Sequence, residues 1–118
     1  MPIEKWSESI AVLHLADDPA FSEDMETLER EGPPILNVVL DFAGVKFMNS
    51  SNIAALLRVR RKLSTGDRKL VLCNVANQVW STLLLTGLDK IFEVTDAVPT
   101  ALATIQMAEP KKTAKKKS

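Results

Sequence analysis

The run Val38-Val39-Leu40, inside the apolar segment 35–42, constrains the fold of this chain more than any other feature. Three consecutive apolar residues leave this segment without a polar face for water. Strands of this kind are typical of parallel sheets that have helices packed on both faces. The segment 35–42 is therefore predicted to be a central strand of an α/β protein.

Strand-like and helix-like patterns alternate along the rest of the chain. Short apolar or alternating runs predict further strands at 3–6, 9–15, 70–75 and 91–94. Helices are predicted between Asp18 and Gly32, at about 51–64, at 76–86, and after Asp96. This alternation predicts one α/β domain over residues 1–108, with a mostly parallel sheet of four to five strands and about four helices.

Capping residues and apolar spacing define the later helices more closely. The helix at 76–86 is expected to end at Gly87, in left-handed backbone. Asp96 is expected to cap the last helix. The side chains of the 76–86 helix that are expected to face the core are Val79, Trp80, Leu83 and Leu84.

The charges of the chain balance, but they are unevenly placed. Fifteen basic residues match fifteen acidic ones, so the whole chain has no general attraction for nucleic acid. Five lysines lie within 111–117, and the segment 109–118 is expected to be a disordered, solvated tail. Contact of this tail with nucleic acid or acidic lipid is the alternative.

Other features of the sequence indicate the compartment. No apolar run approaches the roughly 20 residues of a membrane span, and the chain does not begin like a secretory signal. Cys73 is the only cysteine, so no disulfide within the chain is possible. A cytoplasmic location is therefore expected, while the oligomeric state is left open.

The most informative segment is 38–57, which runs VVLDFAGVKFMNSSNIAALL. A buried strand here ends at Asp41, a loop leads to Asn49-Ser50-Ser51-Asn52, and an apolar helix follows. This pattern resembles the signature of the STAS domain family, named for sulfate transporters and anti-sigma factor antagonists. The runs 68–75 and 83–92 resemble the next strand of the family and its helix end with the final strand. The resemblance covers about 9–105.

The resemblance implies regulation by phosphorylation. In bacterial antagonists of this family, an anti-sigma factor of the histidine-kinase-like ATPase type phosphorylates the first serine of the turn, and it binds the unphosphorylated form. Ser50 matches this serine, with Ser51 as the alternative acceptor. Asp18 matches an acidic residue near the same pocket. The family's aspartate before the serines is Asn49 here and its glycine after them is Asn52, which tolerates left-handed backbone and is expected to preserve the turn.

The chemistry of the turn is consistent with this role. Ser50 is expected at the start of a helix, where free amides and the positive end of the helix dipole favour an anion such as phosphate. Unmodified, Ser50 is expected to cap that helix. The residues expected to contact a partner protein are Asn49, Ser51, Asn52, Ile53 and Asp18.

Two other functions are open from the sequence. One is a constitutive adaptor of a scaffold or lipid-transport complex, and the other is a nucleotide or small-ligand binder at the same helix start. The sequence contains no Gly-rich phosphate loop, nucleophile elbow or paired metal motif, so no catalytic residue, metal or cofactor is predicted. His14 is expected on a strand surface, and Trp80 in the core rather than at an interface.

Overall fold

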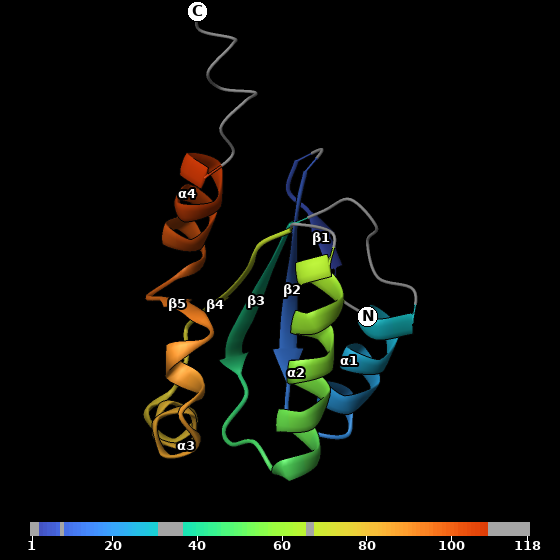
Figure 1. Ribbon diagram of the computed structural model, residues 1–118, viewed down its shortest axis with the longest axis vertical. Coiled ribbons are helices and arrows are strands. Elements are labelled where there is room, and N and C mark those ends of the chain that lie inside the picture. Colours follow the sequence, from blue (N-terminus) through green and yellow to red (C-terminus); the bar gives the residue numbers. More distant parts are fainter. Residues whose placement is uncertain (1–2, 8, 31–36, 66–67, 109–118) are drawn as a thin grey trace, which may run out of the picture.

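The computed structural model describes residues 3–7, 9–30, 37–65 and 68–108 and contains a five-stranded sheet flanked by helices (Figure 1). The strands lie in chain order across the sheet. The first strand pairs antiparallel with its neighbour, and the other pairs are parallel. The strands are β1 (Ile3–Lys5), β2 (Ile10–Ala16), β3 (Asn37–Gly44), β4 (Leu70–Cys73) and β5 (Glu93–Thr95).

Helices cover both faces of the sheet, but unequally. The α-helices are α1 (Ala20–Arg30), α2 (Ser50–Thr65), α3 (Asn77–Thr86) and α4 (Val98–Ala108), and a 3-10 turn, η1 (Leu88–Lys90), follows α3. The buried residues of α1, α2 and α3 share one core cluster with one face of the sheet. Those of α4 form a second cluster with the opposite face. The predicted α/β architecture is therefore confirmed.

Alternation along the strands explains the two clusters. Leu13 on β2 and Leu40 on β3 point toward the larger cluster, whereas Val12 and Val39 point toward α4. Successive side chains of a strand point to opposite faces, so the predicted central strand needs apolar residues at consecutive positions. Val38, Val39 and Leu40 are all buried, as the sequence predicts.

The predicted end of α3 is confirmed, but the predicted direction of one of its side chains is wrong. Gly87 has a φ of 77° and its amide donates to carbonyls of the last turn, which is the predicted left-handed stop. Leu84 was predicted to face the core, but it is 49% exposed. The core-facing positions of α3 are Val79 and Leu83, spaced four residues apart, and Leu84 follows them around the helix.

The start of α4 and the last strand also differ from the prediction. The carbonyl of Ala97, not of Asp96, accepts the first helical hydrogen bond, from the amide of Ala101. Within the described residues, the Asp96 carboxylate makes no capping bond, so the predicted cap is wrong. The last strand begins at Glu93 because the preceding residues continue η1, where the Phe92 amide donates to Leu88.

Some predictions lie outside the described residues. These are the stop at Gly32 and the tail at 109–118. In the described part of the chain, no helix has both the length and the apolar character that crossing a membrane requires.

Candidate functional site

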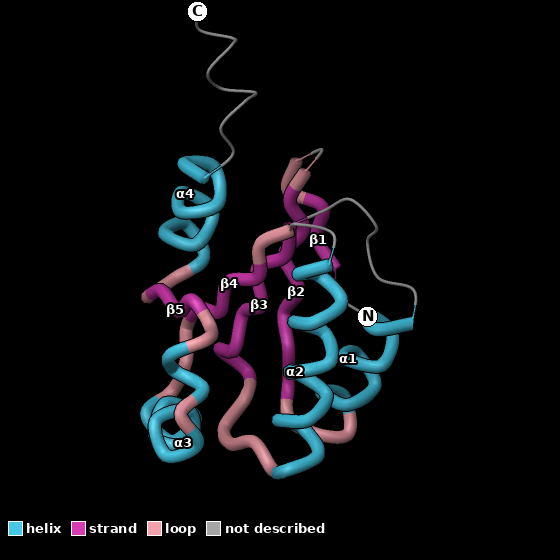
Figure 2. Tube along the Cα trace, viewed as in Figure 1, coloured by secondary structure: helices cyan, strands magenta, loops and turns pink. Residues whose placement is uncertain are grey.

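The carboxyl ends of the parallel strands meet at one edge of the sheet, and the loops that follow β2, β3 and β4 lie at this edge (Figure 2). The loop after β3 leads to residues 49–52, which we call the 49–52 turn. The loop after β2 contains Asp18 and leads to α1. The fold therefore brings together Asp18 and the turn, which are some thirty positions apart in the sequence.

Asn49 caps α2. Its carbonyl accepts the first helical hydrogen bond, from the amide of Ile53 (3.0 Å). Its side-chain Oδ1 accepts from the amide of Asn52 (2.8 Å), and Asn52 Oδ1 accepts in return from the amide of Asn49 (3.1 Å). This reciprocal pair has the pattern of a capping box, which satisfies two backbone donors at a helix start.

Ser50 is therefore not the cap that the sequence predicted, but the first residue of the helix. Asn49, one position earlier, takes the capping role because its amide side chain also reaches the α2 amide three residues on. The Ser50 side chain is exposed. Among the described residues, the backbone amides of Ser50 and Ser51 have no hydrogen-bond partner, so they face solvent at the positive end of a 16-residue helix.

Asn52 joins the turn to α1. It is 3% exposed, and its Nδ2 donates to Asp18 Oδ2 (3.0 Å) and to Ser22 Oγ (3.2 Å). Asn52 was predicted to preserve the turn because asparagine tolerates left-handed backbone, but Asn52 does not adopt that conformation. The only described non-glycine residue with positive φ is Asn74, and Asn52 lies within the helix. Its value to the turn comes from its hydrogen bonds.

Asp18 is the charged member of this network. Oδ2 also accepts from Asn49 Nδ2 (3.3 Å), while Oδ1 accepts from the amide and the hydroxyl of Ser22 (3.0 and 2.8 Å). The hydrogen bond from Asn52, with those from Ser22 and Asn49, holds the pKa of Asp18 below its ordinary value despite partial desolvation. Asp18 is thus a carboxylate at neutral pH, directly beside the start of α2.

The remaining predicted contact residues fall into two groups. Asn49 and Ser51 are exposed beside Ser50, so a partner protein can reach them. Ile53 is half-buried and packs against the larger core cluster, and Asn52 is buried. These two can support the shape of the turn, but they offer less surface for contact.

A second polar cluster lies at the same edge of the sheet and was not predicted. Asp41 Oδ2 is 2.7 Å from His14 Nδ1, and Asp41 Oδ1 accepts from Asn74 Nδ2 (2.9 Å) and the Ala43 amide (3.0 Å). His14 and Asp41 lie in the carboxyl-terminal halves of β2 and β3, and Asn74 directly follows β4. The parallel order of these strands was the signal that could have placed His14 and Asn74 beside Asp41.

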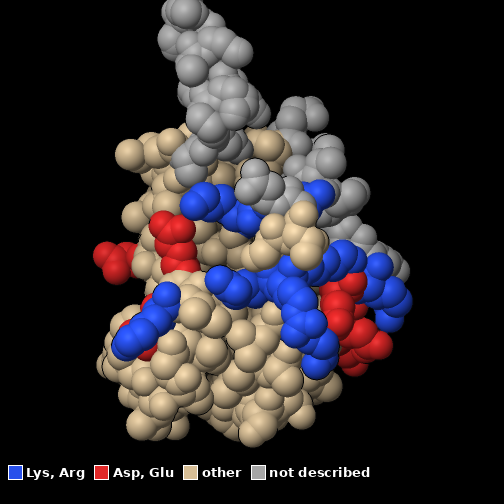
Figure 3. Space-filling view, in the orientation of Figure 1, with Lys and Arg blue, Asp and Glu red and all other residues tan. Residues whose placement is uncertain are grey.

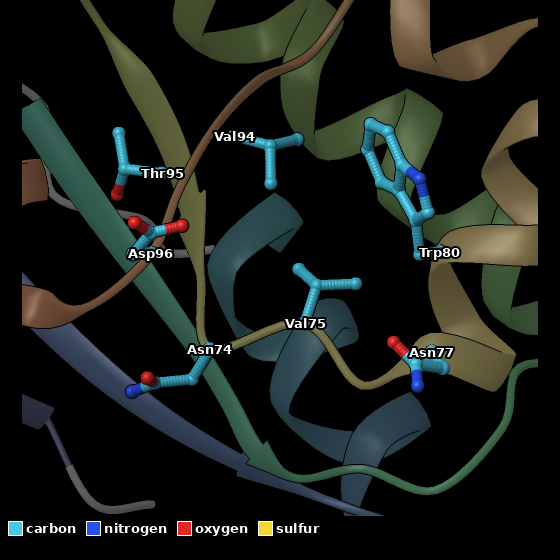
Figure 4. Close-up of a pocket in the computed structure, with 7 residues that line it drawn as sticks. All are labelled: Asn74, Val75, Asn77, Trp80, Val94, Thr95 and Asp96. Carbon is cyan, nitrogen blue, oxygen red and sulfur yellow. The ribbon is translucent and has the colours of Figure 1, made fainter.

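A hollow of about 350 Å³ lies beside this cluster, between β5 and the start of α3 (Figure 4). Trp80, Val75 and Val94 form its apolar wall. In Figure 4 the side chain of Asn74 points away from Trp80, consistent with its bond to Asp41. Trp80 is half-buried and packs against the larger core cluster, as predicted, but it also lines this hollow.

Comparisons with known proteins agree with this fold. The family model described as the STAS domain matches residues 9–101. A putative anti-sigma factor antagonist from Thermotoga maritima has a similar structure, with a TM-score of 0.76, 15% identity, and coverage of 89% of this chain and 93% of that one. An anti-sigma-factor antagonist (STAS) domain protein from Planctomyces limnophilus also has a TM-score of 0.76, with 19% identity and coverage of 89% and 97%.

Two further similar structures are a phosphorylated protein and a chain of a larger assembly. Phosphorylated SpoIIAA, a Bacillus cell fate determinant, has a TM-score of 0.64, 19% identity, and coverage of 87% of this chain and 96% of that one. A chain of the stressosome, described as a signal integration and transduction hub, has a TM-score of 0.73, 19% identity, and coverage of 92% and 99%. At these identities the likeness establishes the fold that the chains share.

Proposed function

This chain belongs to the STAS domain family, and we propose that it is an anti-sigma factor antagonist, a cytoplasmic bacterial regulator of transcription rather than an enzyme. Its partner is an anti-sigma factor that is also a serine kinase of the histidine-kinase-like ATPase type. The chain binds this partner through the 49–52 turn, and phosphorylation of Ser50 weakens the complex. The observation that carries the proposal is the exposed Ser50 side chain at the first position of α2, beside the Asp18 network.

The surroundings of Ser50 favour both modification and a large response to it. The free amides of Ser50 and Ser51 can donate to a phosphate at the helix start. A phosphate adds about 1.5 to 2 negative charges at pH 7. The partner would meet this charge together with that of Asp18, so the electrostatics of the contact surface would change sharply.

Refolding of the turn is not required for this switch. Asn49 and Asn52 fix the backbone of the turn through their reciprocal hydrogen bonds, and these bonds do not involve the Ser50 hydroxyl. Phosphorylation therefore acts through added charge and bulk at a preformed surface. SpoIIAA, which shares the fold, is described in a phosphorylated and an unphosphorylated form, and this likeness supports the proposal.

The test has a phosphorylation arm and a binding arm. The purified chain is incubated with its kinase and ATP, and mass spectrometry locates the phosphate. We expect phosphate on Ser50, its loss in Ser50→Ala and its retention in Ser51→Ala. We also expect Ser50→Asp to bind the kinase at least about tenfold more weakly than the wild type. Phosphate on Ser51 alone, no phosphate, or full affinity of Ser50→Asp would contradict the proposed switch.

A constitutive adaptor is the second candidate function. The residue before the serines is Asn49, whose amide caps the helix without phosphate or carboxylate, and the fold is also that of a stressosome chain. An adaptor of this kind would co-purify with scaffold or transporter subunits. Phosphatase treatment would leave that association unchanged, whereas the phosphorylation switch predicts stronger binding to the kinase after treatment.

A further inference from the structure

Two stretches of the chain, 47–57 and 70–88, contain no Asp, Glu, Lys or Arg. The first stretch includes the 49–52 turn and the first half of α2, and the second includes all of α3. Figure 3 shows the result as a continuous uncharged surface over α3 and the start of α2, below a band of Lys and Arg over the second half of α2. We call it the α2–α3 surface. Depletion of charge with exposed apolar side chains is typical of the centre of a protein interface.

Large apolar side chains are exposed within both stretches. Leu85 on α3 is 87% exposed, and its neighbour Leu84 is also well exposed. Phe47, just before the turn, is 57% exposed. Neither leucine is a core position of α3, whose buried residues are Val79 and Leu83. Their burial by a partner would remove apolar area from water, which is the main favourable term in association.

The outer row of α2 connects Ser50 with the basic band. Ser50, Ala54, Arg58 and Arg61 follow one another at spacings of four, four and three residues, so they share a face of the helix, and all four are exposed. Arg58 Nε donates to Glu29 Oε1 on α1 (2.9 Å). Within the described residues Arg61 has no such partner. It lies about 16 Å from Ser50 along the helix axis.

We propose that the α2–α3 surface binds a protein that presents apolar side chains to Leu84 and Leu85 and a carboxylate to Arg61. This inference rests on the proposed function and adds to it the chemistry of the partner, which is the kinase that modifies Ser50. The partner's acidic group faces the second half of α2, and its apolar group faces α3. Ser50 lies on the same outer row of α2 as Arg61, at the start of the helix.

Charge selects this partner over a second copy of the chain. The groups that border the α2–α3 surface along α2 are cations, namely Arg58, Arg60, Arg61 and Lys62. A second copy using the same surface would bring the same cations, and its nearby carboxylates, Glu29 and Asp18, already accept hydrogen bonds within their own chain. An acidic partner is attracted to this band, and a phosphate on Ser50 would place added charge and bulk on the same row of α2 within the contact surface. The same surface therefore accounts for both recognition and release.

The test uses the full chain and the purified kinase that labels Ser50. Affinities are measured by titration calorimetry and association rates by stopped flow, at several salt concentrations. Leu85→Ser is expected to weaken binding about tenfold or more. Arg61→Glu is expected to weaken it about tenfold, mainly through slower association, and to remove most of the salt dependence. Both positions are exposed, so the melting temperature should not change.

A matched control lies away from the surface. Met107→Ser changes a similarly exposed apolar side chain on α4. It is expected to bind like the wild type. A kinase that binds the wild type but loses no affinity with Leu85→Ser or with Arg61→Glu would overturn the corresponding contact and leave the proposed function intact. If no kinase binds the wild type, the proposed function and this inference both fail. Dimerisation of the chain that Leu85→Ser abolishes would instead identify a second copy as the occupant.

Discussion

The buried side chain of Asn52 makes three hydrogen bonds at the site, so its removal should destabilise the fold. Its side chain accepts from the amide of Asn49 and donates to Asp18 and Ser22, while almost none of it is exposed. Asn52→Ala leaves the Asn49 amide unsatisfied and removes the link between α2 and α1. We expect a loss of about 2–3 kcal/mol in the free energy of unfolding, measured by urea denaturation.

Ser51→Ala is the control for this prediction. Ser51 is the adjacent residue and is exposed, and its side chain makes no hydrogen bond within the described part of the chain. Its substitution should change the free energy of unfolding by less than about 0.5 kcal/mol. Equal effects of the two substitutions would show that the Asn52 network does not stabilise the fold.

Asp41 predicts a dependence of stability on pH. Burial raises its pKa, but hydrogen bonds from Asn74, the Ala43 amide and His14 outweigh burial, so the pKa lies below the ordinary value of 3.8. A carboxyl with a lowered folded-state pKa stabilises the fold fully above its unfolded pKa, and this contribution is lost as the pH falls through the folded-state pKa. Asp41→Asn should therefore flatten the loss of stability below about pH 4, as measured by urea midpoints.

Asp24 is a control for this prediction, because its pKa is shifted in the opposite direction. Burial raises its pKa, with a smaller effect of Glu23 in the same direction. The folded state thus binds a proton more readily than the unfolded chain, and stability is gained as the pH falls through the raised folded-state pKa. Asp24→Asn removes this gain, so its urea midpoint should fall more steeply on acidification than that of the wild type. A flatter profile for both variants would contradict the assignment.

At the scale of the element, the end of α3 depends on Gly87. Its φ of 77° is unfavourable for residues with a Cβ, and a Cβ added there would meet no atom within 4 Å. The cost of Gly87→Ala is therefore a backbone cost of about 1 kcal/mol, or about 5 °C in melting temperature. Gly87→Asn should lose less, because asparagine adopts left-handed backbone more readily. A melting temperature equally lowered by both would indicate a steric cause.

Element types were predictable from local patterns, whereas some facing and capping details were not. The buried run at Val38 and the left-handed stop at Gly87 depend on neighbours in the sequence, and both were predicted correctly. Leu84 is apolar and fits a helical stripe only approximately, so packing decides its direction. Asp96 is a good capping residue, but the chain path after β5 makes Ala97 the residue at the helix start.

At the candidate site, too, some features follow from the local sequence and others only from the tertiary fold. The position of Ser50 at a helix start follows from the local pattern, and the helix begins at that residue. Asn49 and Asn52 stand in the sequence as two amide side chains three residues apart, which is the spacing of a capping pair. Ser50 was nevertheless predicted to be the cap. The bond from Asn52 to Asp18 joins different loops, so its detection requires the tertiary fold.

At the scale of the whole molecule, the two faces of the sheet are protected unequally. Three helices cover one face, while α4 alone covers the other through Ala101, Leu102 and Ile105. An element with fewer buried contacts opens at a lower free energy than the global unfolding. We therefore expect undocking of α4 to be the first opening of the fold, and Cys73 lies beneath it.

Cys73 makes this opening measurable. Burial, with the nearby Asp41 charge, raises its pKa to about 11, and it is fully buried, so thiol reagents can react with it only in open states. Ile105→Ala removes about 2 kcal/mol or more of apolar packing on α4, which should speed the labelling of Cys73 about 30-fold. Leu56→Ala makes a comparable change in the other cluster and should leave labelling at low denaturant nearly unchanged, since α4 stays docked. Equal acceleration in both variants would mean that Cys73 is exposed only by global unfolding, and α4 would then belong to the same cooperative unit as α1, α2 and α3.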